Sequence, residues 1–315
     1  MLKIGCVSLD VSHPLGFAAN MQNGCMDMRY EYVWDNGFRK EEEAEWFVKK
    51  FKLKAKVDNI ADMVDYVDIG FIHSCNWEKH LDQAMPFIEK NKPVFIDKPI
   101  VGSKSDIRRL KELIKNGAKI MGSSSARYAD EIKEYLSKPV EERGEILSIF
   151  GTCGVDEFNY GIHIVEILSE LAGSKAVSCR FVGEGKTADG KKSEIYSIKY
   201  ENGIRATYHS VIGAWHPFHI SLMTTKGTVS FIINSGKIYM SLLKEIYNEY
   251  MRGKSRLADI DTLINCTETM LCGKKSKESG KNEEIKLNEL CDGDKFDGYS
   301  FEKEYGEKST TIYKD

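Results

Sequence analysis

Residues 94–99 read Val-Phe-Ile-Asp-Lys-Pro, a short apolar run followed by an acid, a lysine and a proline. The apolar run is typical of a buried parallel strand. In open parallel sheets the ligand crevice lies outside the carboxyl ends of the strands, so we expect Lys98 to face a crevice. Partial desolvation there lowers the pKa of a lysine and suits it to proton transfer. Pro99 fixes the turn, and a cis bond before it, which a proline allows, would set the direction of the Lys98 side chain. The alternative is an ordinary strand end with a solvated lysine and a turn proline.

Strand and helix patterns alternate through the first third of the chain. Apolar strands are expected at residues 2–7, 30–34, 67–72, 94–96 and 119–122, with helical patterns between them. Successive β-α units predict an α/β fold in which a doubly wound parallel sheet forms an N-terminal Rossmann domain. We place that domain at residues 1–122.

The rhythm changes after residue 122. Several strand patterns follow one another, separated by polar turns such as Asn202-Gly203, and one helical pattern interrupts them at residues 162–171. This favours an α+β domain over residues 123–285, with a large, mostly antiparallel sheet that carries a helix on one face and is open on the other. Residues 286–315 are charged and poor in apolar side chains, which predicts an extended C-terminal tail.

Composition excludes several classes of partner. The 45 basic and 48 acidic residues give a net charge of −3, so no electrostatic case exists for nucleic acid. No apolar run approaches the roughly 18 residues of a membrane helix. Met1 leads straight into an apolar strand and leaves no room for a signal peptide. The eight cysteines are scattered without a CxxC pair, which favours reduced thiols and a cytoplasmic location. His216 and His219 lack an acidic or Cys companion, so we expect no metal site.

Two motifs upstream of Lys98 give the strand ends a recognisable pattern. Residues 76–80 read Asn-Trp-Glu-Lys-His, residues 91–94 read Asn-Lys-Pro-Val, and Asp-Lys-Pro follows at residues 97–99. In order and spacing this block resembles the Gfo/Idh/MocA family of dinucleotide-dependent oxidoreductases, which includes glucose–fructose oxidoreductase and inositol dehydrogenase. The resemblance runs over about residues 2–285. The family has Glu where this chain has Asp97.

A second anchor of the resemblance is residues 159–163, Asn-Tyr-Gly-Ile-His, where the family reads Asp-x-Gly-x-His. The resemblance implies that His163 is the general acid/base and that Lys98 polarises or protonates the same substrate oxygen. The alternative for His163 is a buried helix residue. Asn159 replaces the family's Asp, and an amide orients a hydroxyl but cannot ionise. Either the acid/base work rests on Lys98 and His163 alone, or dehydrogenation is impaired.

The turn after the first strand departs further from a dinucleotide-binding pattern. The three glycines of G-x-G-x-x-G fall on Ser8, Asp10 and His13. A carboxylate at Asp10 repels a pyrophosphate. Ser12 and His13 are candidate donors to the phosphates at the start of the following helix. We therefore expect a remodelled phosphate loop, and weak or absent cofactor binding is the alternative.

The remaining candidate site residues are placed by position. Asp35 closes the second strand, where a carboxylate accepts from the ribose diol and favours NAD over NADP; the alternative is a loop Asp that starts an Asp-Asn-Gly turn. Further cofactor-binding candidates are Ser74, Asn76, His80, Asp97 and Lys98. Candidate substrate contacts are Lys98, Arg127, Tyr160, His163, Trp215 and His216, and of these Arg127, Tyr160, Trp215 and His216 are candidates, by position only, to line the open sheet face.

These observations lead to three hypotheses of function. The first is an NAD-dependent oxidoreductase that transfers a hydride between nicotinamide and a secondary alcohol or ketone of a sugar, polyol or similar metabolite. The second is a non-catalytic ligand-binding or regulatory protein on the same scaffold, and the third is a redox-neutral enzyme that retains NAD. The resemblance also implies a homodimer or homotetramer built through the open sheet face. Fold alone does not choose among these hypotheses.

Overall fold

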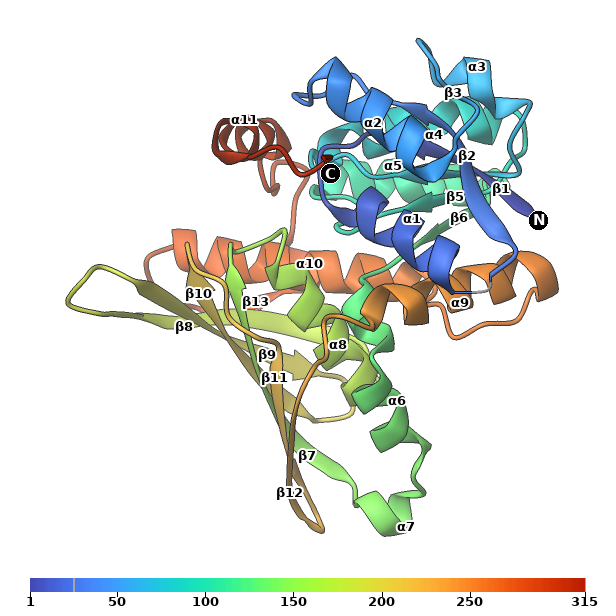
Figure 1. Cartoon of the computed structure of the whole chain (residues 1–315). Coiled ribbons are helices and arrows are strands. Elements are labelled where there is room, and N and C mark those ends of the chain that lie inside the picture. The colour runs from blue at the N-terminus through green and yellow to red at the C-terminus, as the bar shows by residue number, and fades with distance from the viewer. Residues whose placement is uncertain (25, 315) are drawn as a thin grey trace. The chain divides into compact units, whose positions relative to one another are not determined.

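The computed structural model describes residues 1–24 and 26–314, which divide into two units (Figure 1). The first unit comprises Met1–Ser123, Leu242–Ile260 and Asp297–Asp315, and the second comprises Ser124–Ser241 and Asp261–Phe296. The sequence places residues 242–260 in the second domain, whereas the structure groups them with the first unit. Each unit is described by itself.

The first unit contains a six-stranded sheet in the order β3-β2-β1-β4-β5-β6. All of its strand pairs are parallel. The strands are β1 (Leu2–Val7), β2 (Met28–Trp34), β3 (Ala55–Lys56), β4 (Ile69–Ile72), β5 (Val94–Ile96) and β6 (Ile120–Gly122). This strand order is that of the Rossmann fold, so the predicted fold class is confirmed.

The central strands are buried on both faces, which explains their continuous apolar sequences. Every residue of β4 and β5 is buried. On one face Phe17 packs edge-on against Phe71, with 6.3 Å between ring centroids. On the other face a Cβ at Gly70 would lie 2.7 Å from the ring of Phe87, which belongs to a helix packed there. Only glycine at this position lets that helix approach the sheet.

Helices cover both faces of this sheet. They are α1 (His13–Asn23), α2 (Glu41–Phe51), α3 (Ala61–Val64), the 3₁₀ helix η1 (Trp77–Lys79), α4 (His80–Glu89) and α5 (Lys104–Lys115). The side chain of Ser103 caps α5 by accepting from the backbone N–H of Asp106. Helix α9 (Ile238–Arg252) buries Leu242, Leu243 and Ile246, and its residues from Leu242 onward belong to the first unit.

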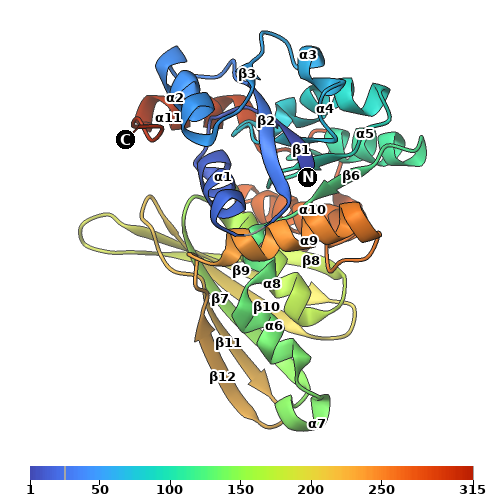
Figure 2. The same cartoon turned by 45° about the vertical axis from the view of Figure 1, so that its right-hand side comes forward.

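The second unit is built on a seven-stranded sheet in the order β12-β11-β7-β10-β9-β8-β13 (Figure 2). Only β7 and β10 pair in parallel among its described strands. The strands are β7 (Ile146–Val155), β8 (Ala176–Lys186), β9 (Lys192–Tyr200), β10 (Arg205–Ile212), β11 (His219–Thr224), β12 (Gly227–Ile232) and β13 (Ile285–Lys286). The mostly antiparallel second sheet is therefore confirmed.

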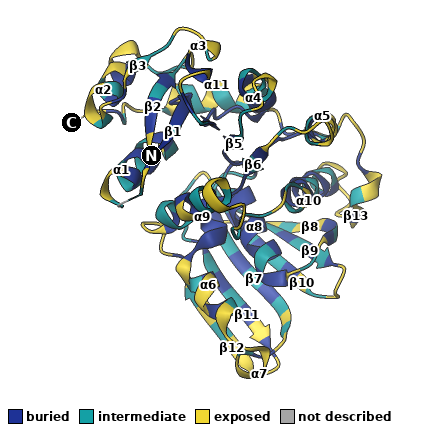
Figure 3. Cartoon of the chain, turned by 90° about the vertical axis from the view of Figure 1, so that its right-hand side faces the viewer, coloured by how far each residue is buried: buried dark blue, intermediate teal, exposed yellow. Residues whose placement is uncertain are grey.

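Helix α8 (Gly161–Ala172) packs on one face of this sheet, against β7 and β10. A Cβ at Gly151 of β7 would lie 2.7 Å from the side chain of Ile164 of α8, so glycine at this position lets the helix pack close to the strand. Burial alternates along the strands (Figure 3), and the side chains of Met223 and Ile232 are exposed. The remaining helices of this unit are η2 (Ser125–Tyr128), α6 (Asp130–Ser137), α7 (Val140–Arg143), α10 (Ile260–Glu278) and η3 (Leu287–Glu289).

The prediction of an extended tail is wrong. Gly298–Lys308 forms helix α11, whose N-cap Asp297 accepts from the backbone N–H of Ser300. The helix forms because its aromatic residues recur at helical spacing: Phe301 packs on Trp77 and Tyr305 on Phe38. The charged residues between them mask this spacing in the composition of the segment.

No helix within the described residues combines the length and apolar character needed to cross a bilayer. The same residues contain no group of three or more His, Cys, Asp or Glu side chains arranged to hold a metal ion.

Candidate functional site

The carboxyl ends of β1, β4 and β5 lie side by side in the first unit, because these strands pair in register at Val7, Ile72 and Ile96. The residues that follow are therefore neighbours. His73 donates its backbone N–H to Val7, and Asp97 donates its own to Ile72.

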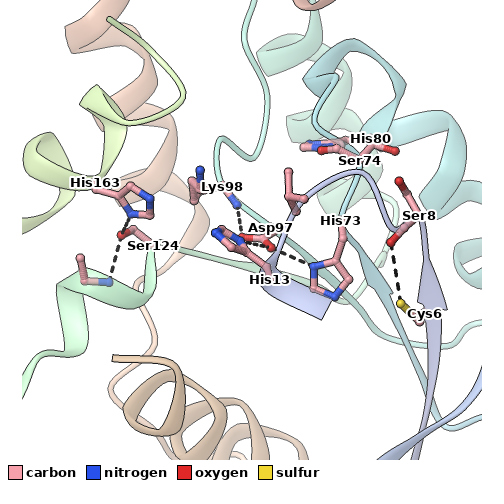
Figure 4. Close-up of polar contacts among 12 residues, drawn as sticks. Cys6, Ser8, His13, His73, Ser74, His80, Asp97, Lys98, Ser124 and His163 are labelled. Carbon is pink, nitrogen blue, oxygen red and sulfur yellow. Dashed lines mark hydrogen bonds and ion pairs between the residues drawn. The ribbon is translucent and has the colours of Figure 1, made fainter. Parts of the chain in front are cut away.

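Asp97 lies at the centre of a buried hydrogen-bond network (Figure 4). Its Oδ2 is 2.7 Å from Nδ1 of His13 and 2.8 Å from Nδ1 of His73. Its Oδ1 accepts the backbone N–H of Lys98 at 2.8 Å. Burial acts to raise the pKa of Asp97, but the two imidazoles outweigh it and hold that pKa well below its usual value. Asp97 is thus an ionised anchor for both histidines.

The protonation of His73 follows from this arrangement. Burial lowers the pKa of its imidazole, although Asp97 opposes the shift. The neutral ring donates from Nδ1 to Asp97, so its Nε2 accepts from the hydroxyl of Tyr30 at 2.8 Å. The sequence predicts Asp97 and His13 in the site but not His73 or Tyr30. The position of His73, one residue beyond a buried strand and directly before Ser74, is the signal that could have found it.

Lys98 follows Asp97 directly and is 7% exposed. Its peptide bond to Pro99 is cis, which the sequence allowed. Ligands of open parallel sheets bind outside the carboxyl ends of the strands, so the position of Lys98 is one from which a side chain can contact a ligand.

The β1–α1 turn is held by side chains in place of glycines. Ser8 adopts a positive φ of 74°. The backbone N–H of Leu9 donates to Asp35 Oδ1 at 2.9 Å, and that of Asp10 donates to Ser8 Oγ at 3.2 Å. Two N–H groups of this turn are therefore already bonded within the protein. Ser12 is exposed at the N-cap of α1 and forms no side-chain cap.

The outer side of the same turn is tied to distant parts of the first unit. Arg39 donates to the backbone carbonyls of Leu9 and Asp10 at 3.1 and 2.7 Å, and also to that of Thr310 at 3.0 Å. The hydroxyl of Tyr313 donates to the carbonyl of Val11 at 2.6 Å. The predicted remodelling of this loop is therefore carried out by residues far away in the sequence.

A cavity of about 300 Å³ opens at the carboxyl ends of β1, β2 and β4. Its size is at the lower end of the range for small-molecule sites. It is lined by Ser8, Asp10, Trp34, Asn36, Gly37, Ile60, Ser74, Lys79, Asp82, Gln83 and Glu302. Asp10 is 2% exposed, and its Oδ1 has no hydrogen-bond partner within the described residues. An unsatisfied buried carboxylate oxygen in the wall of a polar cavity indicates that the cavity accepts a hydrogen-bond donor.

Burial also shifts the pKa values of Asp10, which lines this cavity, and of the neighbouring Asp35. It raises the pKa of Asp10, although the backbone N–H of Cys75 opposes the shift. It raises the pKa of Asp35 to about 6, and the carboxylate of Asp10 adds to the effect. Asp35 does not line the cavity; its Oδ1 holds the backbone of Leu9.

The loop after β4 places three more predicted residues. Ser74 donates to Gln83 Oε1 at 2.7 Å in the cavity wall, and Asn76 donates to Glu302 Oε2 at 3.0 Å. His80 is completely buried, with Nε2 2.8 Å from the carbonyl of Ser74 and Nδ1 3.2 Å from that of Ile100. It clamps two loops together and has no exposed surface.

In the second unit, His163 lies in the first turn of α8 and is buried. Its Nδ1 is 2.6 Å from the hydroxyl of Ser124, which also accepts the backbone N–H of Ala126 (Figure 4). Glu166 accepts the backbone N–H of Ser124 at 2.9 Å. The sequence does not predict Ser124, since only the fold brings it to His163.

Asn159 and Tyr160 are organised by Asp156. The side chain of Asn159 donates to Asp156 Oδ2 at 3.4 Å, and the backbone N–H of Tyr160 donates to Oδ1 at 2.9 Å. The ring of Tyr160 lies 5.7 Å from that of His163. An acid is thus retained three residues before Asn159.

The other predicted substrate contacts lie in different settings. Arg127 is buried against α8, donating to the carbonyl of Glu166 at 3.0 Å and pairing with Glu170 at 2.6 Å. Trp215 and His216 lie in the loop between β10 and β11. Trp215 is 69% exposed there. Gly213, with a positive φ of 79°, and Pro217 interrupt the strand pattern on either side of them.

A larger hollow of about 670 Å³ lies at the opposite, amino-terminal edge of the first sheet, near Asp68, Lys92 and Tyr250. Ligands of open parallel sheets bind at the carboxyl edge, so this hollow is not assigned to the site.

Comparison with known proteins agrees with this geometry. Residues 16–124 match the model of the Gfo/Idh/MocA family, described as an oxidoreductase family with an NAD-binding Rossmann fold. The predicted family resemblance is confirmed. All but the last of the matched residues lie within the first unit. No curated protein sequence matches the chain.

Solved structures extend the likeness over most of the chain. A probable dehydrogenase from Thermotoga maritima has a TM-score of 0.78 at 14% identity, covering 92% of this chain and all of its own. Scyllo-inositol dehydrogenase from Lactobacillus casei, with bound NAD(H) and scyllo-inositol, has a TM-score of 0.78 at 16% identity, covering 91% and 99%. Myo-inositol 2-dehydrogenase from Lactobacillus plantarum has a TM-score of 0.77 at 15% identity, covering 90% and 99%. At these identities the likeness is one of fold.

Proposed function

We propose that the protein is an NAD-dependent dehydrogenase that interconverts a secondary alcohol and a ketone on a polyol or sugar-like substrate. The observation that carries the proposal is the polar cavity at the carboxyl edge of a sheet whose sequence matches an NAD-binding Rossmann model. Lys98 lies buried at the end of β5 on the same edge. The reaction needs a site for the cofactor and a group that contacts the substrate oxygen, and the cavity and Lys98 at the carboxyl edge of the sheet are our candidates for these roles.

The residues present fit the adenosine half of NAD. Asn36, Lys79 and Gln83 line the cavity with donors and acceptors, and Asp10 offers an unsatisfied oxygen. Ser12 and His13 would meet the phosphates at the start of α1, since the N–H groups of Leu9 and Asp10 are bonded elsewhere. When bound, NAD supplies the acceptor or donor of the hydride.

The protein's own contribution is to hold and move the proton of the substrate hydroxyl. Lys98 would orient and polarise the substrate oxygen as a point charge. His163 would exchange the proton, with Ser124 fixing the direction of its ring through Nδ1. Asn159 would orient a neighbouring hydroxyl, since its amide is held by Asp156. Tyr160 completes the lining in this proposal.

A polyol is proposed because such substrates are named for the structural neighbours, which include enzymes of scyllo- and myo-inositol. The polar surroundings of His163, namely Asn159, Tyr160 and Ser124, suit a substrate that offers several hydroxyl groups.

We also propose a cytoplasmic homo-oligomer. Seven cysteines of the described chain are free thiols, six of them buried, which suits a reducing compartment. The open face of the second sheet exposes Met223 and Ile232 and carries Phe150 beside His209, a surface suited to pairing with another copy.

The second candidate function is a ligand-binding or regulatory protein, or a redox-neutral enzyme that retains NAD. The bonded N–H groups of Leu9 and Asp10 favour it, because a dinucleotide-binding turn normally presents such groups to the pyrophosphate. Asn159 in place of the family's Asp favours it as well.

Two measurements on the purified protein test the proposal. Titration with NADH, followed by fluorescence, should show binding below millimolar concentration. Reduction of NAD should follow addition of myo- or scyllo-inositol or a related polyol. Absence of NADH binding at millimolar concentration would favour the binding-protein hypothesis, and NAD that copurifies and survives dialysis would favour redox-neutral turnover.

The residue assignment is tested by Lys98→Ala and His163→Ala. Each should lower turnover by roughly 10²- to 10⁴-fold, the usual range for a lost general acid or base, with little change in NADH affinity. Lys115→Ala, on the exposed end of α5, is the matched control and should leave turnover unchanged. Retained turnover in both site variants would overturn the assignment.

A further inference from the structure

The C-terminal segment forms part of the cofactor cavity. We propose that Glu302 of α11 recognises the hydroxyl groups of the adenosine ribose and makes the site selective for NAD over NADP. This inference rests on the proposed function and extends it to a residue outside the Rossmann strands.

Residues 297–314 are packed firmly across the loops that surround the cavity. Phe301 lies 5.1 Å from Trp77, and the backbone N–H of Gly298 donates to Glu78 at 2.9 Å. A Cβ at Gly298 would lie 2.2 Å from Asn76 Oδ1, so the helix touches the β4 loop directly. The segment is therefore a fixed wall of the cavity.

Glu302 is held with its carboxylate in that wall. Its Oε1 is 2.6 Å from the ammonium of Lys79, and its Oε2 accepts from Asn76 at 3.0 Å. The side chain is 18% exposed and lines the cavity beside Asp10. A carboxylate has about four acceptor positions, so two remain for the hydroxyl groups of a ligand.

The usual acid for this role is occupied elsewhere. In Rossmann domains a carboxylate at the end of the second strand accepts from the ribose. Here that residue is Asp35, whose Oδ1 accepts from Leu9 and which does not line the cavity. Glu302 does line it, so the ribose acid has moved from β2 to α11.

The charges of the cavity oppose a 2′-phosphate. Asp10, Asp82 and Glu302 line it with Lys79 as the basic residue among its lining side chains. Lys79 is already paired with Glu302. The phosphate of NADP would add about two negative charges to this setting, whereas the ribose of NAD adds donors that the carboxylates accept.

The test compares NADH and NADPH affinities at one ionic strength by fluorescence titration. The wild-type protein should prefer NADH. Glu302→Gln should weaken NADH binding by about tenfold while NADPH binding is kept or improved, so the preference falls. Glu304→Gln is the matched control, since Glu304 is 65% exposed on the same helix and pairs with Lys308. It should leave both affinities unchanged.

A second measurement changes the ligand as well as the protein. Wild-type protein should bind NAD that lacks the 2′-hydroxyl of the adenosine ribose about tenfold more weakly than NAD. In Glu302→Gln this difference in affinity should shrink, because in a double-mutant cycle two groups that interact do not have additive effects. If Glu302→Gln weakened the binding of NADH and NADPH equally, or left the preference for NADH over NADPH unchanged, the inference would be overturned while the proposed function stands. No NADH binding by the wild-type protein would instead overturn both.

Discussion

Two turns at the carboxyl edge of the first sheet differ in how they are built. In the turn after β5, Asp97 accepts the backbone N–H of its neighbour Lys98 and also binds His13 at the start of α1 and His73 after β4. The turn after β1 carries side chains where a dinucleotide-binding turn has glycines, and it is held by Asp35, Arg39 and Tyr313. In the β5 turn the acid that holds the backbone is an adjacent residue and itself binds two distant histidines, whereas in the β1 turn the side chains that hold the backbone from outside come from distant residues. The following predictions test that contrast.

The largest effect is expected at the β5 turn. Asp97→Asn removes the charge that two imidazoles share and should lower the free energy of unfolding by about 3 kcal/mol at pH 7.5. The folded protein depresses the pKa of Asp97. The stabilisation from the ionised carboxylate is therefore fully present above the unfolded pKa near about 4, and it is lost as the pH falls from there through the lower folded pKa. Urea unfolding at several pH values measures this.

Asp82→Asn is the control for that measurement. Asp82 pairs with Arg109 at the surface, and such pairs contribute about 0–1 kcal/mol. Equal losses in the two variants would show that Asp97 is no anchor.

At the β1 turn, Asp35→Asn should stabilise the protein. Burial raises the pKa of Asp35 to about 6, so above pH 6 the folded protein holds a charge that burial disfavours. The amide oxygen of asparagine can still accept from Leu9. The gain should be about 2 kcal/mol at pH 8 and should vanish near pH 4, where Asp35 is protonated in the folded state. Thermal unfolding at both pH values measures this gain in stability. A gain of the same size at pH 8 and pH 4 would contradict the explanation by burial of a charge.

Tyr313→Phe tests the link between the β1 turn and the C-terminal segment. It removes the hydrogen bond to the carbonyl of Val11 and keeps the ring, so the expected loss of stability is about 1 kcal/mol. Tyr299→Phe, at an exposed position of α11, should cost nothing measurable. Chemical denaturation compares them, and a loss confined to the control would refute the link.

The smallest effect is expected for Ser8→Gly. Glycine relieves the cost of a positive φ, which is about 1 kcal/mol, but the hydrogen bond from Asp10 to Ser8 Oγ is lost at a similar cost. Stability should therefore change by less than about 0.5 kcal/mol in urea unfolding. A loss above 1 kcal/mol would show that the side chain holds the turn.

The contrast also explains what could be predicted from the sequence. The strand at residues 94–96 and the lysine after it follow from adjacent residues, so both were predicted. His73, Tyr30 and Ser124 were missed because each acquires its role from a partner more than 20 residues away. Helix α11 was missed because charged residues dilute its aromatic spacing. Where the function of a side chain is set by a distant partner, local patterns do not contain it.

The buried position of Tyr313 has a consequence for how the first unit is made. Its strands are synthesised early, but the residues that close the β1 turn leave the ribosome only after the whole second unit. At usual translation speeds that delay is on the order of ten seconds or more. During this interval Trp77 and Phe47 lack their C-terminal aromatic partners, so the nascent domain exposes an apolar surface that a chaperone could hold.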